Sequence, residues 1–142
     1  MKTALIVVGV LAILAVIAFF FLGQKSQSGS ALGLVNGKLA DCPSSPNCAS
    51  SERGTPDEKR VDALPSDAWA KLPAAVEAMG GIVTVAEPTY LAAQFTSKTF
   101  KFVDDLEFRL DDDAVQVRSA SRVGYSDRGV NKARIEALRV AL

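Results

Sequence analysis

The chain contains no histidine, only two cysteines and one tryptophan among its 142 residues. Without histidine, neither a Ser-His-Asp nor a Cys-His nucleophile can form, and no imidazole can act as a base near neutral pH or bind a haem iron. A zinc site needs four ligands, commonly Cys or His, so it would require unusual carboxylates or a second chain. We therefore expect no metal and no cofactor. Any catalysis would rely on carboxylates, Lys, Tyr or Arg.

An excess of charge of either sign is also missing, because sixteen basic residues balance sixteen acidic ones. Lys2 and Lys25 precede residue 30, so the rest of the chain has fourteen basic and sixteen acidic residues, a net charge of about −2. Nucleic-acid binding depends on a basic surface. We therefore expect no nucleic-acid partner.

The longest apolar run covers residues 4–23, which include no charged or strongly polar side chain. About 20 such residues cross a hydrocarbon core as a helix. A cleaved secretory signal is the alternative, because small residues at 28–30 precede Ala31. The run is longer than the usual apolar core of a signal. We predict an uncleaved single span, with the membrane as a partner through residues 4–23.

The two cysteines, Cys42 and Cys48, enclose a short loop that contains two prolines. An even cysteine count after a membrane-targeting segment indicates an oxidising compartment and one small-loop disulfide. The alternatives are a redox-active pair, which usually has the tighter Cys-x-x-Cys spacing, and part of a metal site. We predict a structural disulfide. This places the protein in the bacterial inner (cytoplasmic) membrane, with a single span and a soluble domain in the periplasm.

The rest of the chain predicts a flexible tether at residues 24–38 and an α+β domain at residues 39–142. Residues 49–65 are predicted as an extended or looping cover. A helix should begin at a Ser66 N-cap and be kinked, or divided into two short helices, by Pro73. A second helix should begin near Gly129, with Asp127 or Ser126 capping its start.

Four strands are predicted between these helices, at residues 81–86, 90–96, 100–110 and 115–122. The fold class is therefore α+β: an N-terminal transmembrane helix, then a four-stranded antiparallel meander sheet with two helices packed on it. The register that keeps one face apolar places Val85 opposite Leu91 in the first hairpin. In the second hairpin, the same criterion places Glu107 opposite Arg118.

Asp104 is the unusual residue of the predicted sheet, because strand alternation places its carboxylate on the core face. A carboxylate there requires hydrogen-bond donors. Ser119, Ser121, Asn131 and Arg134 are the expected partners if the last helix covers this face. Three interpretations stay open: a buried carboxylate that fixes the helix to the sheet, a pocket for a polar ligand, and catalytic acid/base chemistry.

The opposite face of the predicted sheet carries charges of both signs. We expect a solvated ladder of cross-strand pairs, each worth a few tenths of a kcal/mol, so that replacement of Arg109 would be nearly silent. The alternative is a docking face for another envelope protein or an anionic head group. Its charged residues are Asp105, Glu107, Arg109, Arg118 and Arg122. The ligand-binding candidates from both faces are Asp104, Arg118, Ser119, Ser121, Arg122, Asn131 and Arg134.

Several motifs occur together along the domain. They lie at residues 42–48, 50–51, 102–105, 107–108, 118–127, 129–131 and 134. In this combination the chain, from about residue 39 to 142, resembles the domain of unknown function 1499. Such proteins occur in plastids and in bacteria, often behind a membrane segment or a lipoprotein signal. The family has no agreed activity, so the resemblance implies no catalytic residues. Relatives often carry a histidine near residues 61–65, where this chain has none.

The function that the sequence favours is a binding or protein-interaction module of the cell envelope, because histidine is absent and the opposite charges can satisfy one another. The alternative is a histidine-independent enzyme that acts on a polar or anionic small molecule through Asp104 with Arg118 or Arg122. A membrane-tethered spacer is the third hypothesis, although a spacer would not need this arrangement of charges.

Overall fold

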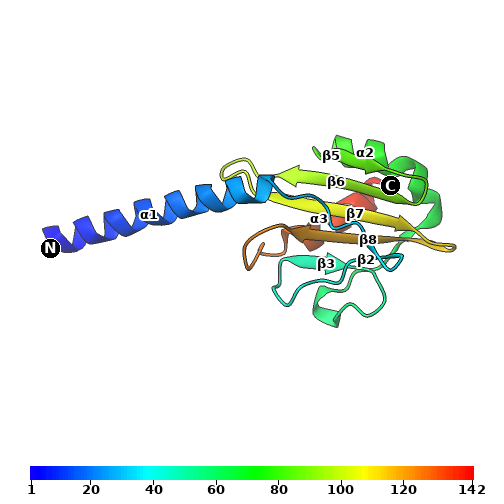
Figure 1. Cartoon of the computed structure of the whole chain (residues 1–142), viewed down its shortest axis with the longest axis horizontal. Coiled ribbons are helices and arrows are strands. Elements are labelled where there is room, and N and C mark those ends of the chain that lie inside the picture. Colours follow the sequence, from blue (N-terminus) through cyan, green and yellow to red (C-terminus); the bar gives the residue numbers. More distant parts are fainter.

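The computed structural model describes all 142 residues and begins with a long helix, α1 (Lys2–Gln27). Figure 1 shows α1 projecting away from one end of the sheet. Its length and apolar composition are sufficient to cross a membrane, and they fit a signal sequence equally well. The helix continues beyond the apolar run, so its last turn reaches the domain and contains Ser26, which is buried.

An antiparallel sheet of six strands forms the centre of the domain, in the order β3-β8-β7-β6-β5, and β4 also pairs with β8. The predicted meander is present as β5 (Ile82–Ala86), β6 (Tyr90–Thr96), β7 (Val103–Leu110) and β8 (Ala114–Ser121). The prediction of four strands was wrong, because the sheet also contains β3 (Cys48–Ser50) and β4 (Leu64–Pro65). Both pair with β8 and are too short to show a periodic pattern in the sequence.

The register of β7 against β8 is the predicted one, including Glu107 opposite Arg118. The first hairpin differs, because a bulge in β5 places Val85 opposite Ala92 rather than Leu91. A β-bulge sets two residues of one strand against one of its partner, so the alternation of side chains changes beyond it.

Helices cover one face of the sheet. The predicted helix around Pro73 is divided into the 3-10 helix η2 (Ser66–Lys71) and α2 (Leu72–Ala78), with the proline in the first turn of α2. Ser66 begins η2 and does not cap it through its side chain, so that part of the prediction was wrong. The last helix is α3 (Val130–Ala141).

The main hydrophobic core lies between these helices and the sheet. The largest fully buried side chains in it are Phe108, Leu64, Leu72, Leu106, Ile135 and Leu138. Figure 1 shows α3 behind the sheet and α2 along the β5 side. The fold is therefore α+β, with the helices on one face of the sheet.

The opposite face of the sheet is covered by the segment that follows α1. This segment includes the hairpin of β1 (Leu34–Val35) and β2 (Lys38–Leu39), whose turn residues Asn36 and Gly37 both have positive φ. Such a two-residue turn matches the twist of the flanking strands. Leu39 packs there with buried residues of β6. Part of the segment predicted as a flexible tether thus lies against the sheet.

Cys42 and Cys48 form a disulfide, which closes a loop immediately before β3. Within this loop the buried Asn47 accepts a hydrogen bond from the backbone N–H of Ser121 at 3.0 Å, and its Nδ2 donates to the Gly124 carbonyl at 2.8 Å. After β3 the chain forms a short 3-10 helix, η1 (Asp57–Lys59), whose last residue donates from its Nζ atom back to the loop. Residues 49–65, predicted as a cover, are therefore held against β8.

Reduction of the Cys42–Cys48 disulfide is expected to lower the melting temperature of the full chain. The closed loop spans a sequence separation of 6, so its loss should cost less than about 3 kcal/mol. Calorimetry with and without a reductant measures the change. The Cys42→Ser/Cys48→Ser double variant is the control and should melt at the reduced temperature in both buffers. An unchanged melting temperature on reduction would show that the bond contributes nothing to stability.

Candidate functional site

The candidate residues predicted from the sequence lie on both faces of the sheet. Along β7 and β8, successive side chains point to opposite faces. We name the two groups the helix-face cluster and the covered-face cluster. The helix-face cluster consists of Asp104, Ser119, Ser121, Asp127, Asn131 and Arg134. The covered-face cluster lies under the segment after α1 and consists of Ser26, Tyr90, Asp105, Glu107, Arg118 and Arg122.

In the helix-face cluster, Arg134 of α3 connects the helix to the sheet. Its Nη2 donates to Asp104 Oδ2 at 2.7 Å, and its Nη1 donates to Ser119 Oγ at 3.0 Å and to Asn131 Oδ1 at 2.7 Å. The guanidinium carbon also lies 4.6 Å from the centre of the Phe95 ring, within range of a cation–π interaction. All four partners expected for Asp104 lie in this cluster, although only Arg134 donates directly to its carboxylate.

Asn131 completes the helix-face cluster. Its Nδ2 donates to Ser121 Oγ at 3.1 Å and to Asp127 Oδ2 at 2.8 Å. Asp127 also accepts from the backbone N–H groups of Gly129 and Asn131, so its carboxylate holds the first turn of α3 as predicted. These groups satisfy one another, and this geometry fits the interpretation in which Asp104 fixes the helix to the sheet.

In the covered-face cluster, the Glu107 side chain is fully buried and accepts three hydrogen bonds. Its Oε1 accepts from the Tyr90 hydroxyl at 2.8 Å and from the Gly33 backbone N–H at 2.9 Å, and its Oε2 accepts from Arg118 Nη1 at 2.9 Å. The pKa of Tyr90 is raised far above its ordinary value, mainly because the hydroxyl is buried and also because the Glu107 carboxylate lies beside it. Its hydroxyl therefore stays protonated and continues to donate.

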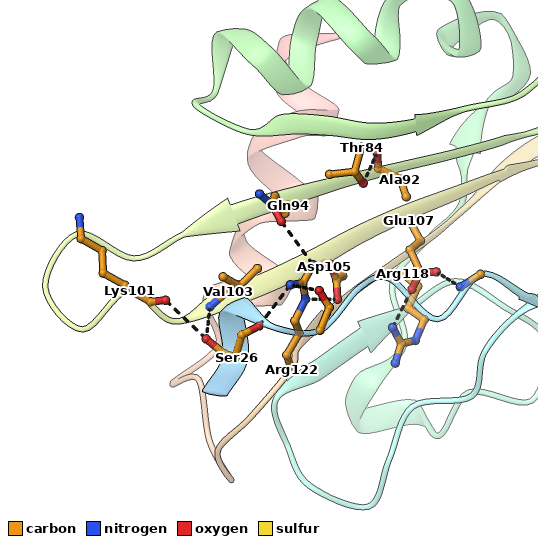
Figure 2. A network of polar contacts seen from close by, with 12 residues as sticks. Ser26, Thr84, Ala92, Gln94, Lys101, Val103, Asp105, Glu107, Arg118 and Arg122 are labelled. Atoms are coloured by element: carbon orange, nitrogen blue, oxygen red, sulfur yellow. Dashed lines mark hydrogen bonds and ion pairs between the residues drawn. The ribbon is translucent and has the colours of Figure 1, made fainter. Parts of the chain in front are cut away.

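Arg122 connects the sheet to the end of α1. Nε and Nη2 bind Asp105 at 2.8 and 2.6 Å, and Nη1 donates to the carbonyls of Ser26 at 3.2 Å and Gly29 at 2.6 Å. Figure 2 shows Arg122 between Asp105 and Ser26, with Gln94 on β6, the strand that pairs with the β7 strand of Asp105. Each nitrogen of the guanidinium thus has a partner, and two of these partners are backbone atoms beyond the apolar run of α1.

Arg118 differs from Arg122, because the only hydrogen bond of its side chain is the one to Glu107. Its side chain is 4% exposed, and its Nε is the one buried side-chain nitrogen or oxygen without a hydrogen-bond partner. Arg118 lines a cavity of about 470 Å³ between the segment after α1, the disulfide loop and the ends of β7 and β8. The charged residues around this cavity are Lys25, Asp41, Asp105, Arg118 and Arg122.

The prediction of a solvated ladder of charge pairs on this face was wrong, because the segment after α1 covers the face. Glu107, Arg118 and Asp105 are all at most 5% exposed. At the far end, Arg109 binds the buried Glu52 through Nε at 2.8 Å and also pairs with Asp111 at 3.1 Å. Hydrogen bonding to Arg109 lowers the pKa of Asp111.

Sequence reasoning missed four residues that organise these clusters: Ser26, Asn47, Glu52 and Tyr90. Tyr90 had a usable signal, because strand alternation places it opposite to Leu91 and therefore on the face of Glu107. Glu52 and Asn47 lie in segments without periodicity, and their burial depends on β8. Ser26 is polar and follows an apolar run, so its position predicts exposure rather than burial.

The Asp104→Ala variant is expected to lower the free energy of unfolding by about 2–3 kcal/mol, because it removes a charge-assisted hydrogen bond from Arg134. Denaturant unfolding of Asp104→Ala, Arg134→Ala and the double variant measures the coupling between the two side chains. Asp112→Ala, in the exposed β7–β8 turn, is the matched control and should change stability little. Additive effects of the two single variants would contradict the pairing.

The Arg109→Ala variant is also expected to be destabilising, by about 1.5–3 kcal/mol, because it leaves the buried Glu52 carboxylate without its charged donor. This reverses the nearly silent effect expected from an exposed ladder. Arg53→Ala is the control, since the Arg53 side chain is exposed and forms no ion pair. Equal stability of the two variants would mean that Glu52 finds water when Arg109 is absent.

The comparison with protein families agrees with the resemblance seen in the motifs. The family model described as "Protein of unknown function (DUF1499)" matches residues 38–142, which contain the whole sheet, the disulfide and both polar clusters apart from Ser26. Neither a curated protein nor a solved structure matches the chain. Because the match covers most of the chain, this protein belongs to the DUF1499 family.

Proposed function

We propose that this protein is a membrane-associated binding module that holds the anionic group of a small molecule in the cavity beside Arg118. The observation that carries the proposal is Arg118, a residue of the cavity lining whose side chain is almost fully buried and whose Nε donor has no partner. An unpaired buried donor costs free energy, and an incoming acceptor removes that cost. Guanidinium groups match carboxylate and phosphate groups in shape as well as charge.

The other charges around the cavity define the ligand further. Lys25 is exposed and pairs with no carboxylate within 4.0 Å, so it adds a second cation, whereas Arg122 is already neutralised by Asp105. Asp41 also lines the cavity and would repel a second negative charge. A ligand with one anionic group, or a zwitterion, therefore fits better than a polyanion.

The proposed location follows from how α1 joins the domain. Cleavage before Ala31 would remove Ser26 and Gly29, whose carbonyls accept from Arg122, and would also remove the buried hydroxyl that accepts from the Val103 N–H at 3.0 Å. These contacts support retention of α1 as a single span of the inner membrane. The disulfide supports an oxidising compartment, and so a periplasmic domain.

The positions of these residues argue against the alternative function, a histidine-independent enzyme. It required Asp104 to act with Arg118 or Arg122, but Asp104 pairs with Arg134 on the helix face, and both arginines lie on the covered face. A protein partner docking on the ladder face is also less favourable, because the protein's own chain occupies that face. A small ligand in the cavity needs neither arrangement.

The test is native mass spectrometry of the full chain, purified gently and released from nanodiscs, alongside thermal melting with added acetate, inorganic phosphate or glycerol 3-phosphate. We expect a non-covalent adduct, or a rise in melting temperature with at least one of these anions. A ligand at a hundredfold excess over its Kd stabilises the folded state by about 2.7 kcal/mol.

Arg118→Lys is the diagnostic variant, because it keeps a positive charge for Glu107 and removes the Nε donor. Arg109→Lys is the matched control, since Arg109 forms an ion pair on the same face and does not line the cavity. The adduct or the thermal shift should be lost in the first variant and kept in the second. Equal binding by both variants, or no response of the native protein to any of the anions, would refute the proposed site.

A further inference from the structure

Four phenylalanine rings connect α1 to the loop between β6 and β7. The Phe100 ring lies 5.3 Å from that of Phe19 and 5.2 Å from that of Phe20, measured between ring centres. The Phe102 ring lies 6.3 Å from that of Phe19 and 6.2 Å from that of Phe100. These separations are typical of interacting aromatic pairs. We name these four residues the aromatic cluster.

The loop that carries Phe100 is closed by two hydrogen bonds between Ser97 and Phe102 and lies in direct contact with α1. The Ser97 N–H donates to the Phe102 carbonyl at 2.8 Å, and the Ser97 hydroxyl accepts from the Phe102 N–H at 2.9 Å. A Cβ atom placed on Gly23 would lie 1.7 Å from the Phe100 carbonyl oxygen, so only glycine permits this approach. The position of the loop along α1 is therefore fixed by backbone contact.

This position has a consequence for depth in a bilayer. Phe19 and Phe20 lie inside the apolar run of residues 4–23, about 4.5–6 Å before its end at the helical rise of about 1.5 Å per residue. A run of this length matches a hydrocarbon core of about 30 Å. When α1 spans a membrane, the Phe100 ring must lie at the depth of the last turns of the span, closer to the bilayer centre than Gly23.

We propose that residues 97–102 form a second membrane contact, in which Phe100 and Phe102 enter the outer edge of the hydrocarbon core beside α1. Phe19 and Phe20 remain about half exposed, and Leu22 is 39% exposed, so apolar surface continues around the cluster. The partner is the lipid bilayer, because this surface is continuous with the spanning helix.

The charges near the loop agree with that partner. Lys98 and Lys101 are both exposed and lie in the same loop as Phe100. Lysine side chains at this level reach the phosphate groups while their carbon chains stay against apolar surface. Aromatic rings with flanking lysines are typical of segments that lie at a membrane interface. The domain is thereby held at two points, and this contact does not depend on the cavity beside Arg118.

Brominated lipids test the proposal in the full chain. The protein, with Trp69→Phe so that no other tryptophan emits, carries Phe100→Trp and is reconstituted into phosphatidylcholine vesicles with bromine on the upper acyl chain. We expect the tryptophan at position 100 to lose most of its fluorescence and to emit at shorter wavelength than in water. Asp112→Trp in the same background is the control, because the β7–β8 turn lies at the opposite end of the sheet (Figure 1) and should keep its fluorescence.

Phe102→Trp provides a second probe in case the first disturbs the close approach to Gly23, and thermal melting checks that each variant is folded. Quenching at either loop position, with none at position 112, supports the bilayer contact. An equal degree of quenching by the brominated lipid at positions 100, 102 and 112 overturns the proposal. The proposal also fails if the loop probes are shielded from the brominated lipid and cross-linking shows a second copy of the chain on the aromatic cluster.

Discussion

The carboxylate of Glu107 is the constraint on which the rest of the covered face depends. A charged group without solvent exposure costs several kcal/mol unless it is paired and hydrogen bonded. Tyr90 and Arg118 of the neighbouring strands supply two donors, and the Gly33 N–H supplies the third. The third donor belongs to the segment after α1, so full satisfaction of Glu107 requires that segment to lie on the sheet. The same placement seals the face and leaves the cavity beside Arg118.

A second polar group connects this face to α1. Arg122 holds Asp105 with one side of its guanidinium and the carbonyls of Ser26 and Gly29 with the other. The last turn of α1 is therefore held against the domain by Ser26, whose carbonyl accepts from Arg122 and whose buried hydroxyl accepts from the Val103 N–H. The aromatic cluster adds apolar contact on the outer side. In a membrane, this arrangement would fix the domain close to the bilayer and place the cavity near the head groups, since Lys25 and Ser26 line it.

Asp104 and Asp105 illustrate how neighbouring residues obtain different roles. Strand alternation directs the first toward α3, where its carboxylate accepts a hydrogen bond from Arg134. It sends the second to Arg122 under the segment after α1. The polar groups of the helix-face cluster are hydrogen bonded to one another, although Asp104, Ser121 and Asp127 line a cavity of about 410 Å³. The covered-face cluster differs because the Nε of Arg118 has no partner, which is why the proposed binding site lies on that face.

The sequence by itself determined the elements whose side chains repeat with a clear period. The register of β7 and β8 and the division of the helix at Pro73 follow from alternation and steric rules, because these act between residues close in sequence or directly opposite in a hairpin. Alternation also placed Asp104 on the helix face, although only Arg134 of its four expected partners donates to its carboxylate. The short strands β3 and β4, the bulge in β5 and the burial of Glu52 and Ser26 have no such local signal. Only the tertiary structure decided that the segment after α1 covers the charged ladder, because that placement is set by a few hydrogen bonds to backbone atoms, such as the N–H of Gly33, which every residue except proline carries. Burial of a face depends on which distant segment lies over it, and the residues of the face itself do not encode that.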